Sequence, residues 1–90
     1  MLVLPACLTH DEATACSRML RQALQREADG TVVVDASPLQ EFDSSAIAVL
    51  LETRREALEA GKAFAVSGLP ERLRSLAGLY GVAGLLPAAA

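Results

Sequence analysis

The sequence predicts an α/β domain with a largely parallel sheet, because short β-branched runs alternate with segments of helical periodicity. Two of the expected strands are apolar runs, TVVV at residues 31–34, between Gly30 and Asp35, and AFAV at residues 63–66. A helix-length segment separates them, which is typical of parallel strands joined by a crossover helix. We expect one domain over residues 1–90, with a sheet of about four strands.

The N-terminal segment predicts a strand followed by a helix. Residues 2–8 (LVLPACL) are apolar, although Pro5 favours an edge position or a bend. Thr9 and Glu12 have the spacing of a capping box, in which the first residue begins a helix and the fourth closes its first turn. Apolar residues at helical spacing extend this helix to about Ala28.

Two further helices are expected. The second runs from about Ser44 to Ala60, with Gly61 as its C-terminal cap. The third covers residues 69–80, with Pro70 in its first turn and Gly81 after its end. The predicted order of elements is therefore β-α-β-α-β-α.

Helical angles divide the second helix into two faces. The inner face is expected to bury Ile47, Leu50, Leu51 and Leu58. The outer face is expected to expose Ser45, Ala48, Val49, Glu52, Glu56 and Glu59. Asp43 and Ser44 stand just before this helix, where Asp and Ser are preferred N-cap residues. One interpretation of the stretch Asp43–Ser45 is simply a helix cap.

Composition excludes several classes of protein. The net charge is −3, and the eight Lys and Arg form no dense block, which disfavours nucleic-acid binding. No apolar run is long enough to span a bilayer, and the N-terminus lacks the basic region of a signal peptide, so we expect a cytoplasmic location. Cys7 and Cys16 are expected to be small buried hydrophobes. Because His10 is the only histidine, we expect no metal and no cofactor.

The outward position of Ser45 gives a second interpretation of this stretch. A phosphoryl group there would lie at the positive end of a helix dipole, near free N–H groups. It would also add about −1.5 to −2 charges beside the small apolar patch of Ala48 and Val49, which would disrupt a partner interface. The sequence therefore predicts a partner surface made of Asp43, Ser44, Ser45, Ala48, Val49 and Glu52.

Residues 32–87 resemble a STAS domain, the fold of anti-sigma factor antagonists. The family pattern is a strand that ends in Asp, a loop, Asp-Ser-Ser-Gly-Leu opening a helix, a Gly before the next strand, and a Leu-x-x-Leu helix. The matching positions are Asp35, Asp43, Ser44, Ser45, Gly61, Leu73 and Leu76, whereas Ala46 and Ile47 replace the usual Gly and Leu. The resemblance implies that Ser45, or as second choice Ser44, is the phospho-acceptor, and that Asp35 is the loop acid. Because the N-terminal part of this chain is short, it also implies that the first strand of the family fold is truncated or absent here.

The tail LAGLYGVAGLLP at residues 76–87 is most similar to the MlaB-like STAS subunits of phospholipid ABC transporters. This resemblance implies a non-enzymatic module that binds the transporter ATPase at the inner face of the membrane, through the start of the second helix. Those subunits typically carry Thr and a small residue where Ser44 and Ser45 stand. The alternative partner is an anti-sigma factor kinase that phosphorylates Ser45. No nucleic-acid partner or membrane insertion is expected, and the sequence predicts no oligomeric state.

The sequence gives less support to two other functions. A hydrolase or transferase with Ser44 or Ser45 as nucleophile would need His10 as base, and no G-x-S-x-G elbow is present. Direct nucleotide binding is the other, but the chain has no G-x-x-x-x-G-K-[ST] loop. A binding module is the favoured interpretation.

Overall fold

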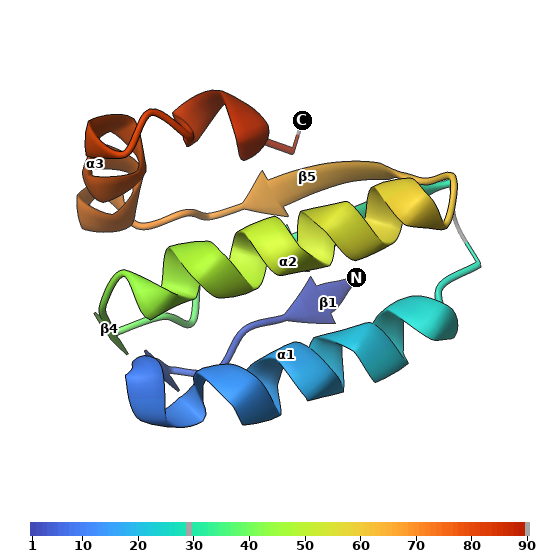
Figure 1. The fold of residues 1–90 in the computed structure, drawn as a ribbon, viewed down its shortest axis with the longest axis horizontal. Coiled ribbons are helices and arrows are strands. Elements are labelled where there is room, and N and C mark those ends of the chain that lie inside the picture. Colours follow the sequence, from blue (N-terminus) through green and yellow to red (C-terminus); the bar gives the residue numbers. More distant parts are fainter. Residues whose placement is uncertain (29, 90) are drawn as a thin grey trace.

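Three parallel strands form the main sheet of the computed structural model, which describes residues 1–28 and 30–89 (Figure 1). They are β1 (Leu2–Val3), β3 (Thr31–Asp35) and β5 (Ala63–Ser67), in the spatial order β1-β3-β5. Each neighbouring pair is parallel. The predicted α/β fold with a parallel sheet is therefore confirmed.

A second, two-stranded parallel sheet joins β2 (Cys7–Leu8) to β4 (Glu41–Phe42). The segment expected as one strand at residues 2–8 is thus two strands in two different sheets. Pro5 lies between them, which confirms the predicted bend. β1 is present, although it has only two residues and lies at the edge of the main sheet. Sequence reasoning missed β4, because a two-residue strand carries almost no periodic signal.

The helices are α1 (His10–Gln25), α2 (Ser45–Glu59) and α3 (Glu71–Leu79), followed by a short 3₁₀ turn, η1 (Ala83–Leu85). α1 and α2 lie side by side, and both begin at the same end of the molecule, where α3 stands (Figure 1). Their order with β1, β3 and β5 confirms the predicted β-α-β-α-β-α alternation. α1 ends at Gln25 rather than near Ala28.

The core lies between the main sheet and these helices. Leu2, Val34 and Val66 occupy one row across the three strands, and all are almost fully buried. Leu20 and Leu50 come from α1 and α2 into the same core. The core is built mainly from Leu, Val and Ala, with Phe64 as an aromatic member, and these side chains pack closely.

The buried face of α2 differs from the predicted one. Val49, expected outside, is only 2% exposed, whereas Leu58, expected inside, is 47% exposed. The reason is that α2 has two neighbours, the sheet and α1. Its buried face therefore turns toward α1 and includes Ala46, Ile47, Val49, Leu50, Thr53 and Ala57. The Thr53 hydroxyl donates to the Val49 carbonyl at 2.9 Å, which satisfies this buried polar group.

Three of the described glycines, Gly61, Gly68 and Gly81, hold backbone conformations that other residues rarely adopt. Gly61 follows α2 with φ +76°, as expected of a helix C-cap. Gly68, after β5, has φ +68°, and a Cβ there would lie 2.8 Å from the Ser37 Cβ. The two loops that follow β3 and β5 therefore touch, and only glycine fits at this contact.

Candidate protein-interaction site

The starts of α1 and α2 share one carboxylate. Asp43 Oδ1 accepts the backbone N–H of Ser45 at 2.8 Å, and Oδ2 accepts the backbone N–H of His10 at 3.1 Å. The hydrogen bond from Ser45 is the main reason why the pKa of Asp43 is lowered, and His10 adds to it. Asp43 thus serves two helix N-termini, which carry unpaired N–H groups and partial positive charge.

The two serines beside it have different surroundings. Ser44 occupies the N-cap position of α2 but makes no side-chain capping hydrogen bond, and it is exposed. Ser45 is the first residue of α2 and is half-buried. Of the two residues predicted as N-cap, Asp43 therefore does the capping. The hydroxyl of Ser44 lies at the surface beside a helix N-terminus.

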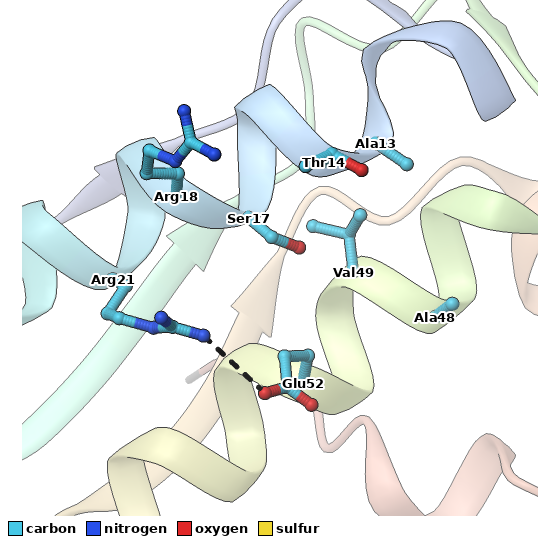
Figure 2. A pocket seen from close by; sticks show the side chains of 8 residues that line it. All are labelled: Ala13, Thr14, Ser17, Arg18, Arg21, Ala48, Val49 and Glu52. Atoms are coloured by element: carbon cyan, nitrogen blue, oxygen red, sulfur yellow. Dashed lines mark ion pairs between the residues drawn. The ribbon is translucent and has the colours of Figure 1, made fainter.

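A groove runs between α1 and α2, with a volume of about 370 Å³ (Figure 2). We call it the α1–α2 groove; its lining residues are Ala13, Thr14, Ser17, Arg18, Arg21, Ala48, Val49 and Glu52. Three predicted partner residues, Ala48, Val49 and Glu52, meet in it. Ala48 is exposed, as predicted. The α1 side was missed, because sequence periodicity does not show which helix lies beside which.

Ion pairs cross the C-terminal part of this groove. Arg21 Nη2 lies 3.9 Å from Glu52 Oε1, and Arg21 Nε lies 3.4 Å from Glu56 Oε1. Arg55, on α2 itself, bonds to Glu52 and to Glu59. The hydrogen bond from Arg55 is the main cause of a lowered pKa at Glu52. The carboxylates of α2 therefore form ion pairs with Arg21 and Arg55 of the same chain.

Asp35, the predicted loop acid, lies at the C-terminal end of β3. Its Oδ1 accepts the backbone N–H of Ser37 at 3.0 Å, and hydrogen bonding to Ser37 lowers its pKa. Asp35 does not line the α1–α2 groove. Its hydrogen bond to Ser37 lies within the turn that follows β3. In such turns an Asp side chain commonly accepts the backbone N–H of the residue two positions later.

His10 and Asp43, from different elements, do lie together near the serines. However, both Asp43 oxygens bind backbone N–H groups. Within the described chain, no hydrogen bond joins the His10 ring to Ser44 or Ser45. The arrangement of a nucleophile bonded to a base, with the base oriented by a third group, is not assembled here.

The cysteines are free thiols on the other side of α1. Cys7 Sγ donates to Glu12 Oε1 at 3.3 Å, and this hydrogen bond raises the pKa of the Cys7 thiol. Burial raises the pKa of Cys16, which is buried as predicted, whereas Cys7 is half-buried. Both thiols are protonated near neutral pH and are poor nucleophiles. Among residues 1–28 and 30–89, no group of three or more His, Cys, Asp and Glu side chains could hold a metal ion.

A comparison with models of protein families identifies the family to which the chain belongs. A family model described as "Mlab, STAS domain" matches residues 1–87. The chain belongs to the MlaB-like STAS family. This confirms the resemblance found in the sequence motif around Asp43. A search of curated proteins finds no match to this chain.

Membership in this family favours a binding role over a catalytic role for the domain. STAS domains are small modules that typically bind protein partners and are generally non-enzymatic. No helix in the described part of the chain is long and apolar enough to cross a bilayer. The exposed Ser44 at the start of α2 and the adjoining α1–α2 groove carry four of the six residues that the sequence predicts as a partner surface, namely Ser44, Ala48, Val49 and Glu52.

Proposed function

We propose that this STAS domain is a regulatory subunit that binds the ATPase of a phospholipid ABC transporter through the start of α2. The observation that carries the proposal is the match of an MlaB-type model to residues 1–87. In this proposal the domain acts in the cytoplasm, at the inner face of the membrane, and catalyses no reaction itself. The ATPase would supply the chemistry, and the STAS domain would change its activity or assembly.

The geometry supports docking at the start of α2. Ser44 and Ala48 are exposed one helical turn apart, and Ser45 lies between them. Since Asp43 already caps the helix, the Ser44 hydroxyl is available to a partner. Small side chains at these positions let another backbone approach closely. A bulky or charged side chain there should exclude it.

Binding to the purified ATPase subunit, measured by titration calorimetry, tests this proposal. Ala48→Arg should weaken binding strongly, because a long cation would occupy the docking surface. Ala15→Arg is the matched control, since Ala15 is also an exposed alanine but lines a different hollow on the other side of α1. Absence of binding by the unaltered domain would overturn the proposal.

An anti-sigma factor antagonist switched by phosphorylation of Ser45 is the second candidate. The position of Ser45 as first residue of α2 favours it. A phosphoryl group on Ser45 would repel the Asp43 carboxylate and compete with it for the N–H of Ser45. Loss of that contact would also release His10, so that modification at α2 would loosen α1.

Incubation with a purified anti-sigma kinase and ATP, followed by mass spectrometry, tests this second candidate. Phosphate should appear on Ser45 and be absent from Ser45→Ala. Modification of Ser44 instead would move the acceptor to the more exposed hydroxyl. If neither serine is modified, while the kinase does phosphorylate an authentic substrate, the switch does not exist.

A further inference from the structure

The α1–α2 groove is held open and in register by contacts at both ends. At the start, the Asp43 carboxylate joins the first turns of the two helices. Further along, Arg21 joins Glu52 and Glu56 across the gap. The space between these ties is therefore a defined feature of the surface, bounded by two helices that cannot easily slide past one another.

Small residues create this space. Ala13 on α1 faces Ala48 and Val49 on α2, and Val49 is buried while Ala48 is exposed. Thr14 and Ser17 add two hydroxyls on the α1 side (Figure 2). An apolar surface flanked by a few polar groups is the usual composition of a groove that receives a side chain of a partner.

The charges of the groove do not balance. Its lining includes the cations Arg18 and Arg21 and one carboxylate, Glu52. Arg21 is paired with α2, whereas Arg18 forms no ion pair with any described residue. Figure 2 shows the Arg18 guanidinium on the α1 side, turned away from Glu52. One positive charge is thus left for an external group, although the whole chain carries −3.

We infer that the partner contacts α1 as well as α2, by placing an acidic segment along the α1–α2 groove. An apolar side chain of that segment lies over Ala13, Ala48 and Val49, and a neighbouring Asp or Glu pairs with Arg18. The guanidinium fork matches a carboxylate in two parallel hydrogen bonds, and arginine is common among residues that dominate interface energies. The inference rests on the proposed function, because the ATPase is the partner that it assigns to this segment.

A charge reversal at Arg18 tests the inference, with the purified ATPase subunit as the probe. Arg18→Glu should weaken binding by about tenfold or more, because a carboxylate then faces the partner's acid. Arg18→Lys should recover part of the affinity, since it keeps the charge but not the fork. Affinity of the unaltered domain should fall as salt rises, and Arg18→Glu should lose much of this dependence.

Arg26→Glu is the matched control. Arg26 is also an exposed arginine of the α1 region, but it lies outside the groove. It should leave binding unchanged, and thermal melting should show that all three variants are folded. If Arg18→Glu and Arg26→Glu bind like the unaltered domain, the groove is not the docking site, while the proposed function stands. If the unaltered domain does not bind the ATPase, the proposed function fails and the inference with it.

Discussion

α1 and α2 begin side by side, yet their first turns are built in different ways. At α1, Thr9 and Glu12 form a capping box, and the Glu12 carboxylate accepts the Thr9 N–H at 2.8 Å. The two residues of that cap lie within four positions of each other, although the thiol of Cys7, in β2, also donates to the Glu12 carboxylate. At α2, the cap is Asp43, and its second oxygen reaches His10, 33 positions earlier. One start is capped from within its own first turn, and the other cap is shared between two helices.

This difference shows how a short chain can begin two neighbouring helices and still leave a polar side chain uncommitted at the surface. The capping box uses the polar side chains of α1 for the helix itself. At α2, one carboxylate serves both helices, and Ser44 makes no capping hydrogen bond. The Ser44 hydroxyl, which the proposed function assigns to a partner, is therefore not needed to begin the helix. Five substitutions test this difference between the two helix starts, beginning with the largest expected effect.

Asp43→Ala should have the largest effect on stability. It removes the acceptor of two backbone N–H groups, at His10 and Ser45, and with it the tie between the two helices. We expect a lower free energy of unfolding in urea than for any other variant in this set. In hydrogen exchange, the amides of His10 and Ser45 should lose protection together. If exchange rises at Ser45 alone, the Asp43 carboxylate does not couple the first turns of α1 and α2.

Thr9→Ala should cost less, about 1 kcal/mol, as is typical for loss of a helix-capping hydroxyl. It removes the hydrogen bond of 2.6 Å between Thr9 Oγ1 and Glu12, while the Thr9 N–H still reaches Glu12. Urea unfolding measures the loss. Amide exchange should rise only in the first turn of α1. A simultaneous rise at the start of α2 would contradict the view that α1 is capped from within its own first turn.

The dependence of stability on pH should separate the two carboxylates. Asp43 and Glu12 both have a pKa below the ordinary values of 3.8 and 4.5, the first mainly through the Ser45 N–H and the second mainly through the Thr9 side chain. A lowered pKa in the folded state means that the ionised group stabilises the fold above its ordinary pKa. That contribution is lost as pH falls through the lower folded value.

Melting temperatures of Asp43→Asn and Glu12→Gln, taken between pH 7 and pH 2, test this prediction. Each variant should be less stable than the unaltered domain at pH 7, and the two curves should converge in acid. Convergence should begin at higher pH for Glu12→Gln, because the ordinary pKa of Glu is higher. A constant difference at all pH values would mean that the charge of the carboxylate is unimportant.

Ser44→Ala should have the smallest effect on stability, within about 0.5 kcal/mol of the unaltered domain, because exposed side chains without specific contacts rarely contribute more. Urea unfolding measures it, with Thr9→Ala as the comparison of a hydroxyl that does cap. The same variant should nevertheless reduce binding to the ATPase if the start of α2 is the docking site. A loss of stability as large as that of Thr9→Ala would show that Ser44 caps α2 after all.

Several features of the fold could be predicted because their causes are local. The capping box needs only Thr9 and Glu12 at the right spacing, and the βαβ order follows from alternating periodicities. Pro5 removes a backbone donor, so the bend between β1 and β2 was also predictable. The family motif from Asp43 to Ser45 predicted the start of a helix, and α2 does begin at Ser45.

Other features depended on residues that are distant in sequence. Helical angles show that α2 has an apolar side, but they do not show that α1 covers Val49 or that Leu58 extends to the surface. The sequence also allows either Asp43 or Ser44 as the N-cap of α2. In the structure Asp43 is the cap, and it accepts the backbone N–H of His10 as well as that of Ser45. The α1 side of the groove, with Arg18, had no sequence signal, because helices pack through surfaces and not through neighbouring residues.

The amino-acid sequence therefore specifies the elements, their order and the serine-bearing start of α2, since hydrogen bonds and periodicities within three or four residues produce them. Only the packing of α1 against α2 decides which face of α2 is buried, which residue caps it, and that Arg18 lies at the groove without an ion pair to any residue that the structure describes. Such packing is a sum of contacts between segments that are tens of residues apart, and no local pattern encodes it.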